Sequence, residues 1–125
     1  MKKLNKMMLF ALMLLLSSAV LAGTNTTSAE VENNLLVGLQ SDNLGLKTSA
    51  AYYLGTYGTS KSVIPLMKIL KSGETEEERI SAAVALSKIN SEQALFAVKQ
   101  RAKYDDSERV RRLCAMFYNQ SLQNN

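Results

Sequence analysis

The sequence predicts an all-α protein, a short α-α superhelix in which pairs of helices stack into one array. From residue 30 onward apolar residues recur at helical spacing, and runs of alternating β-branched residues are missing. The chain also matches itself without a gap when it is shifted by 32 positions, so that Ala50-Ala51 falls on Ala82-Ala83 and then on Cys114-Ala115. A helical repeat of this length is typical of solenoids, whose core forms between neighbouring repeats.

The first 22 residues are typical of a secretory signal peptide. Lys2, Lys3 and Lys6 precede an apolar run over residues 7–16, and small or apolar residues lead to a cleavage position after Ala22. An uncleaved membrane anchor is the alternative, but the stretch over 7–22 is shorter than the roughly 20 residues that a spanning helix needs. We therefore expect an exported bacterial protein, periplasmic or secreted, without stable membrane insertion after cleavage.

The charge balance gives no support to nucleic-acid binding. The whole chain has 15 basic and 11 acidic residues, a net charge of +4, but three of the basic residues lie in the predicted signal peptide. The 12 that remain exceed the acidic residues by one. Bulk charge therefore gives no reason to expect a nucleic-acid partner, and we expect none.

Residues 23–29 are small and polar, which predicts a flexible leader before a repeat domain over 30–125. The domain begins with a leading helix over about 30–41, marked by Val31, Leu35 and Leu39. Two repeats follow over about 42–73 and 74–105, and a final helix covers about 106–122. Because this solenoid is short, its end helices are expected to act as caps or to offer an apolar face to another chain.

Each repeat is predicted to consist of two helices. In the second repeat, Thr75 and Glu78 form a capping-box pattern at the start of the first helix, and Asn90-Ser91 separates it from the next. In the first repeat, Gly55 and Gly58 end one helix and Ser60 or Ser62 caps the next. Pro65 then falls in the first turn of that helix, where its missing N–H costs little.

Oppositely charged residues recur in the same register. Each unit has an acidic residue followed five positions later by a basic one. We predict a ladder in which the base of one repeat bonds to the acid or to the helix-end carbonyls of the next. The alternative is a set of solvated surface charges, each of which contributes little. The residues of the predicted ladder are Asp42, Lys47, Glu74, Arg79, Asp106 and Arg111.

A basic residue followed by a small pair recurs as Lys47-x-x-Ala50-Ala51, Arg79-x-x-Ala82-Ala83 and Arg111-x-x-Cys114-Ala115. This pattern resembles the HEAT-repeat family, in particular the short bacterial repeats shared with phycobilin-lyase-type proteins, over about residues 31–122. Two residues depart from the family pattern, since Lys47 replaces the usual Arg and Cys114 replaces an Ala. The resemblance implies a right-handed superhelix of HEAT-like helical hairpins that binds other proteins.

In the resembled family the second helix of each repeat lines the concave surface, where binding usually occurs. Here these helices carry several basic residues, and spacings of three and four place pairs of them on common faces. We predict a basic stripe that attracts an acidic peptide or polyanion; the alternative is a set of solubilising lysines. The stripe residues are Lys61, Lys68, Lys71, Lys99 and Lys103, with Arg101 between the last two.

Two further surfaces are candidates for partner binding. At the C-terminal end, Met116 and Tyr118 are expected to remain partly exposed and to mark a possible terminal interface. In the first repeat, Tyr52 or Tyr57 could anchor a partner, since tyrosine is enriched at interfaces, whereas Tyr53 is predicted to pack inside. For Tyr52 and Tyr57 the alternative is ordinary packing.

The sequence gives no support to catalysis or to cofactor or metal binding. There is no His, no phosphate-binding glycine loop and a single cysteine, Cys114, at a small repeat position where a buried thiol is expected. We therefore predict an exported, non-catalytic protein-interaction module whose partner and oligomeric state the sequence does not identify. The alternatives are a structural or regulatory subunit that stacks end to end on a partner or on itself, and a lyase-like accessory protein.

Overall fold

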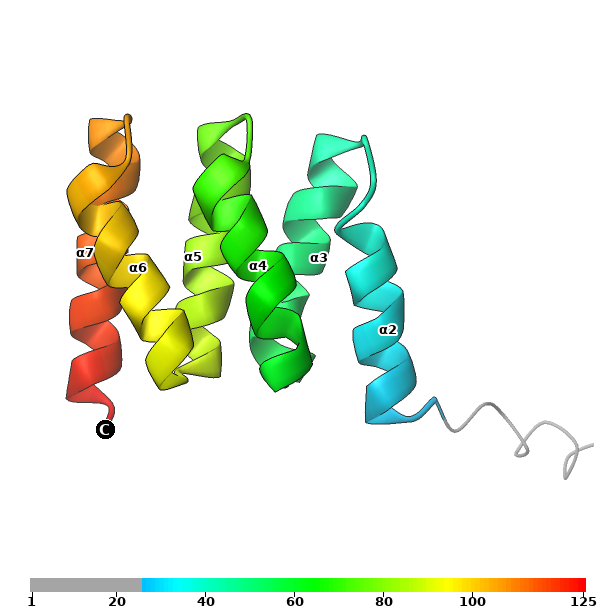
Figure 1. Ribbon diagram of the computed structural model, residues 1–125. Helices are drawn as coiled ribbons and strands as arrows, with labels where there is room; N and C mark the ends of the chain where they lie inside the picture. Colours follow the sequence, from blue (N-terminus) through cyan, green and yellow to red (C-terminus); the bar gives the residue numbers. More distant parts are fainter. Residues whose placement is uncertain (1–25) are drawn as a thin grey trace, which may run out of the picture.

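The structure, a computed structural model, describes residues 26–125, which form six helices and no strand (Figure 1). The helices are α2 (Ser28–Gly38), α3 (Leu44–Tyr57), α4 (Ser60–Ser72), α5 (Glu76–Ile89), α6 (Glu92–Tyr104) and α7 (Glu108–Gln123). The predicted all-α class is confirmed. The predicted signal peptide (1–22) and residues 23–25 of the predicted leader lie outside the described residues. Among the helices within 26–125, none has the length and apolar character to span a bilayer.

The helices form two layers (Figure 1). In one layer α3, α5 and α7 pack side by side, and in the other α2, α4 and α6 lie across them. Each helix of the second layer packs closely on the helix that follows it in the chain, so the pairs in space are α2/α3, α4/α5 and α6/α7. The predicted units 42–73 and 74–105 pair α3 with α4 and α5 with α6, so the observed pairs are shifted by one helix. The 32-residue period fixes the spacing of the helices but not which two neighbours form a pair.

Every described helix begins at a side-chain N-cap, and the caps are evenly spaced. They follow one another at intervals of 16 residues, so two intervals make the 32-residue period of the sequence. Each cap accepts a hydrogen bond from a backbone N–H of the first turn, which contributes about 1 kcal/mol. The caps are Thr27, Asn43, Thr59, Thr75, Ser91 and Ser107. The cap of α4 is therefore Thr59 and not Ser60 or Ser62, so Pro65 lies beyond the first turn of α4, and Gly55 lies inside α3.

The first described helix begins earlier than expected. Ser28 and Ala29, assigned above to the flexible leader, form the first turn of α2. Thr27 is the N-cap, and it exchanges two hydrogen bonds with Glu30 in a capping box. Low apolar content suggested a flexible segment, but Thr27-x-x-Glu30 is itself a helix-start pattern, and it corrects the boundary.

The core lies between the two layers and between neighbouring pairs of helices. The paired alanines of α3 and α5 are buried, and the large side chains around them, including Leu54, Leu66 and Leu86, are fully buried. Small residues let α3 and α5 approach closely, since a Cβ added to Gly55 would lie 2.8 Å from the Cα of Ala85. The repeated small pairs are thus part of the core, and Gly55 against Ala85 is a point of close approach between α3 and α5.

Candidate binding groove between α4 and α6

The α4/α6 face carries apolar side chains that the core does not use. Both helices bury one stripe toward α5 and α7, with Val63 and Leu66 on α4 and Val98 on α6. On the outer side, Ile64 and Phe96 occupy the same repeat position and are 59% and 60% exposed. Exposed apolar residues at equivalent positions of neighbouring helices are typical of a contact surface rather than of a solvated face.

A groove of about 360 Å³ lies between the two helices, and it is mainly apolar. Its volume is within the range of sites that hold a large side chain or a small ligand. One wall comes from the second half of α4 and the other from α6. The lining residues are Met67, Leu70, Lys71, Phe96, Ala97, Gln100, Arg101 and Tyr104.

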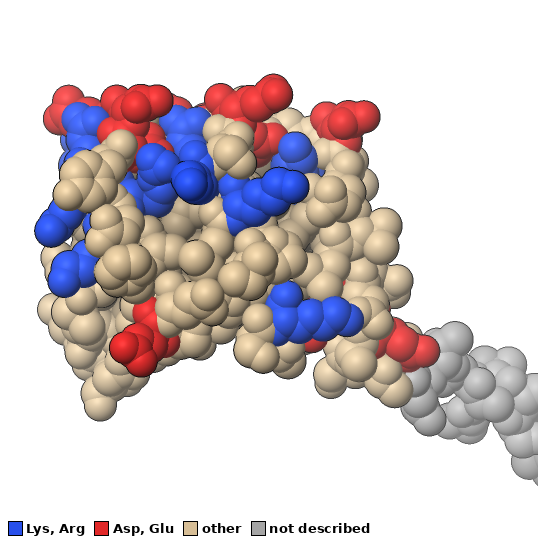
Figure 2. All heavy atoms as spheres, viewed as in Figure 1, with Lys and Arg blue, Asp and Glu red and all other residues tan. Residues whose placement is uncertain are grey.

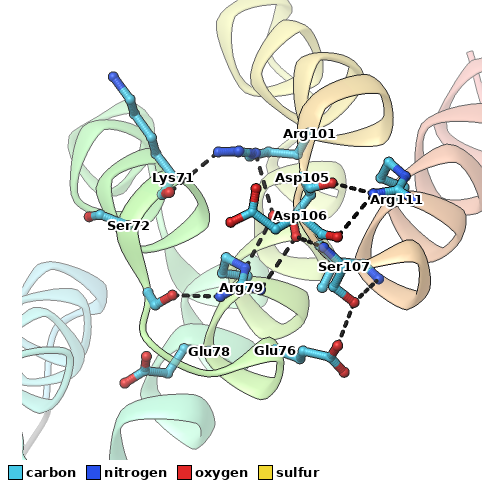
Figure 3. A network of polar contacts seen from close by, with 12 residues as sticks. Lys71, Ser72, Glu76, Glu78, Arg79, Arg101, Asp105, Asp106, Ser107 and Arg111 are labelled. Carbon is cyan, nitrogen blue, oxygen red and sulfur yellow. Dashed lines mark hydrogen bonds and ion pairs between the residues drawn. The ribbon is translucent and has the colours of Figure 1, made fainter.

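Two basic residues form the rim of this groove at the carboxyl ends of α4 and α6. Arg101 is held in place, because its Nη1 donates to the Lys71 carbonyl at 3.3 Å and its Nε lies 3.5 Å from Oδ2 of Asp105. The Lys71 side chain points away from these contacts (Figure 3), and in the described part of the chain its ammonium group forms no ion pair. Lys71 is thus a free cation beside an apolar groove.

A buried carboxylate fixes the position of this rim. Asp105, whose side chain is 2% exposed, lies at the end of α6 and forms ion pairs with Arg79 at 3.1 Å and with Arg101. Its Oδ1 also accepts hydrogen bonds from Nη2 of Arg79 at 3.3 Å and from the backbone N–H of Ser107 at 3.0 Å. Figure 3 shows these groups converging from α5, α6 and α7, so one carboxylate ties three helices together.

The basic residues of the predicted ladder do link neighbouring elements, but their acidic partners differ from those predicted. Lys47 bonds to Glu78 at 2.8 Å and not to Glu74, and Arg79 pairs with Asp105 and not with Asp106.

The helix-end carbonyls are the more regular part of the ladder. Nη1 of Arg79 donates to the Gly73 carbonyl at 2.7 Å, and Nη1 of Arg111 donates to the repeat-equivalent Asp105 carbonyl and to the Asp106 carbonyl. The predicted acids Asp42, Glu74 and Asp106 are exposed in the turns between paired helices. The predicted acids lie in turns and point to solvent, whereas Glu78 in the first turn of α5 and Asp105 at the end of α6 face a neighbouring helix and form the ion pairs.

Of the five lysines in the predicted stripe, the structure places only Lys71 on the groove. All five are exposed. Lys61 bonds to Asn33 on α2, and Lys68 lines a separate depression between α4 and the α2–α3 turn. The Lys99 ammonium lies 5.7 Å from the ring centre of Tyr118 on α7.

In Figure 2 the Lys and Arg side chains of this face gather mainly below a row of acidic residues along the edge where the paired helices are joined. Uncharged surface lies beneath them, and a separate basic patch and acidic patch lie near the opposite edge. The observed arrangement is therefore an apolar groove with a basic rim at one end, and it is not one continuous basic stripe.

Sequence reasoning missed the apolar half of this site. The repeat pattern treats Phe96 only as an apolar position and gives Tyr104 no role, yet the two side chains are 60% and 68% exposed. The signal was available, because Ile64 and Phe96 share a repeat position and lie outside the stripe of residues that each helix buries. A periodic apolar residue that departs from the buried face of its helix indicates a surface site.

The other predicted surfaces have mixed outcomes in the structure. Met116 is 43% exposed at the C-terminal end, and Tyr118 is half-buried against α6. Tyr52 and Tyr57 are about half exposed, as an anchoring role requires. Tyr53 was predicted to pack inside, but it is 49% exposed, because in this layer no helix within residues 26–125 precedes α3.

The chemistry of this region favours binding over catalysis. Cys114 is fully buried, and that burial, together with the nearby Asp105 carboxylate, raises the pKa of its thiol to about 11, so the thiolate that a nucleophile needs is scarce at neutral pH. Within residues 26–125 no group of Asp, Glu, Cys or His side chains is arranged to hold a metal ion.

Comparison with known proteins bears on the fold rather than on the groove. The family model for HEAT repeats matches residues 33–117, which is more than half of the chain. No curated protein matches the sequence. The matched region spans α3 to α6 completely and includes the groove, the buried Asp105 and the repeated small pairs. Proteins built from such repeats are generally scaffolds for protein interaction. This chain belongs to the HEAT-repeat family.

Proposed function

We propose that this protein is an exported, non-catalytic interaction module that binds an acidic segment of another protein in the α4/α6 groove. The observation that carries the proposal is the free cation Lys71 beside an exposed apolar groove lined by Phe96 and Tyr104. A segment that fits has a large apolar side chain to fill the groove and carboxylates beside it.

Three properties of the groove support a peptide rather than a rigid globular partner. It runs between two helices, its exposed apolar residues are aromatic, and its charge is confined to one end. Aromatic side chains contribute large contact area with few rotatable bonds, which is why they dominate the binding energy of many interfaces. A carboxylate placed near Lys71 and Arg101 gains specificity and a faster association rate from charge complementarity.

Selection of short random peptides on the immobilised protein tests this proposal. We expect the recovered peptides to be rich in Asp and Glu next to Phe, Leu or Met. The strongest peptide is then synthesised, and its affinity is measured by fluorescence anisotropy against the protein and its variants. Lys71→Glu and Phe96→Ser should each weaken binding at least about tenfold, which is the size of effect typical of a central contact.

Lys99→Glu is the matched control. It makes the same charge change on α6, but Lys99 lies against Tyr118 and does not line the groove. We expect it to change the affinity less than about threefold, since it removes only a distant screened charge. Recovery of basic peptides, or an equal loss in Lys99→Glu and Lys71→Glu, would contradict the proposal.

We also propose export with cleavage after Ala22. The support is the order of a basic start, an apolar run and small residues in the first 22 residues of the sequence. Mass spectrometry of the protein from the periplasm or the culture medium should give a mature chain that begins at Gly23. An intact N-terminus in a membrane or cytosolic fraction would be the contrary result.

A further inference from the structure

We infer that the outer face of α3 is a self-association surface through which two copies of this protein pair about a two-fold axis. The surface is formed by Leu46, Ser49, Tyr53 and Tyr57, which recur at helical spacing on one side of α3, and we call it the α3 stripe. All four residues are exposed, and the three large ones are 49–54% exposed.

The repeat register identifies the α3 stripe as an unpartnered packing face. The equivalent residues on α5 are Glu78, Ser81, Ala85 and Ile89, and those on α7 are Val110, Leu113, Phe117 and Ser121. All eight are buried or half-buried, because the preceding helix of the same layer packs over them. Within residues 26–125 no helix of that layer precedes α3. The face that is covered on α5 and on α7 is therefore exposed on α3.

Continuing the array with a second copy does not close this face. Head-to-tail stacking would place α7 of one copy where a helix before α3 belongs. The α3–α5 contact needs Gly55 against Ala85, where even one added carbon lies 2.8 Å from the Ala85 Cα. At the new junction the equivalent residues are Asn119 and Tyr53, a bulkier pair than Gly55–Ala85 between α3 and α5 or Ser87–Phe117 between α5 and α7, so the two helices cannot approach as closely as at either existing junction. End-to-end stacking in the repeat register is therefore disfavoured.

Two-fold pairing of α3 with itself fits the side chains better. When two copies of the stripe run antiparallel, Leu46 of one lies opposite Tyr57 of the other, and Ser49 lies opposite Tyr53. The central contacts then place a large residue on a small one, and the outer contacts are apolar. Tyr53 and Tyr57 are already stacked, with ring centres 6.5 Å apart, so these side chains lose little conformational freedom on pairing.

The charge of α3 favours a second copy over a charged partner. Its single charged residue is Lys47, and the Lys47 ammonium is bound to Glu78 on the side that faces α5. The α3 stripe therefore offers nothing to attract an acidic or basic partner and causes no repulsion between two copies. A face without charge that is rich in tyrosine is typical of the central part of an interface.

The size of the stripe sets the expected strength. Its three large residues are each about half exposed, so each contributes roughly 100 Å². Each copy then buries roughly 300 Å², and the roughly 600 Å² in total is below the 1,200–2,000 Å² of stable complexes. We therefore expect a reversible dimer with a dissociation constant of about 100 µM, in the class of weak, transient contacts.

Sedimentation velocity of the mature protein over a concentration series up to about 1 mM, tenfold above that constant, tests the inference. We expect a monomer–dimer equilibrium without larger species. Gln93→Glu, which adds a charge at an exposed position of the opposite layer outside the α4/α6 groove, should leave the equilibrium unchanged. A protein that stays monomeric at the highest concentration, or that forms an open-ended series of oligomers, would overturn the inference.

A charge exchange tests the predicted register. Ser49→Glu and Tyr53→Lys should each weaken dimerisation at least about tenfold, because each places two like charges at a two-fold interface. In the double variant, the carboxylate introduced at position 49 of each copy lies opposite the ammonium group introduced at position 53 of the other. This variant should therefore dimerise more strongly than either single variant at low salt. Failure of the double variant to recover, with helical content unchanged by circular dichroism, would refute the antiparallel pairing. The α4/α6 groove is on the other layer, so peptide binding tests the proposed function independently.

Discussion

Replacing the buried Asp105 carboxylate by an amide is expected to destabilise the whole array. Asp105→Asn keeps the shape of the side chain and one acceptor oxygen, so the hydrogen bond from the Ser107 N–H can persist. It removes the charge that balances Arg79 and Arg101, whose side chains are only 15% and 20% exposed. The perturbation therefore isolates the cost of two poorly solvated cations that have lost their counter-ion.

The structure sets the magnitude of this effect. Breaking a buried ion pair by removing one partner costs about 3–5 kcal/mol. Because both guanidinium groups retain some contact with water, and because Arg79 also donates to the Gly73 carbonyl, we expect about 3 kcal/mol, at the lower end of that range. Arg101→Gln removes the more distant cation, at 3.5 Å, and should cost about 1 kcal/mol.

Urea unfolding followed by circular dichroism measures these losses. The midpoint should fall with little change in the slope, since the surface exposed on unfolding stays the same. Asp106→Asn is the matched control, because this neighbouring acid is exposed and its side chain makes no ion pair within the described residues; its effect should stay within about 0.5 kcal/mol. A loss below about 1 kcal/mol for Asp105→Asn, or one equal to the control, would refute the assigned role.

Three further predictions concern other buried or capping groups. Burial alone raises the pKa of the Glu32 carboxyl, but hydrogen bonds from Ser62 and Thr59 outweigh it and hold this pKa below its ordinary value. Glu32→Gln should therefore lower the free energy of unfolding by about 2 kcal/mol at pH 7. In urea unfolding, the difference between this variant and the unchanged protein should shrink as the pH falls below about 4.3, because Glu32 is then protonated in the unfolded chain. Cys114 should react with a thiol reagent only at the rate of opening or unfolding, and fast labelling of the native protein would contradict its burial. Thr75→Ala removes an N-cap and should cost about 1 kcal/mol in thermal unfolding, whereas Thr56→Ala, at an exposed position in the last turn of α3, should cost less.

Periodicity carried most of the fold prediction. The 32-residue match and the small pairs predict the helices, their packing layer and the burial of Ala82, Ala83 and Cys114, because these properties repeat with the sequence. The pairing of helices could not be read in the same way, since a period gives spacing without phase. The start of α2 was misplaced for a different reason, because one capping box outweighs the composition of a short polar segment.

In the groove, Ile64 and Phe96 follow the repeat and could have been found, whereas the α3 stripe and the ion pairs depend on departures from the repeat, which periodic reasoning averages away. Tyr53 shares its position with the buried Ala85, and only its place at the start of the layer exposes it. The acidic partners of Lys47 and Arg79 also lie off register, at Glu78 and Asp105, because an ion pair depends on which helix end lies within reach. Charges at matching positions therefore predicted that a ladder exists but not its partners.

The even spacing of the N-caps has a consequence for how the array can change length. Since a cap occurs every 16 residues from Thr27 to Ser107, a duplication of any 32-residue window carries one complete pair of helices and both of their start signals. Such a duplication would leave every other cap next to the helix that it starts. Copying a window of 32 codons within this region can therefore lengthen the scaffold by one pair of helices, and a variant lengthened in this way should fold.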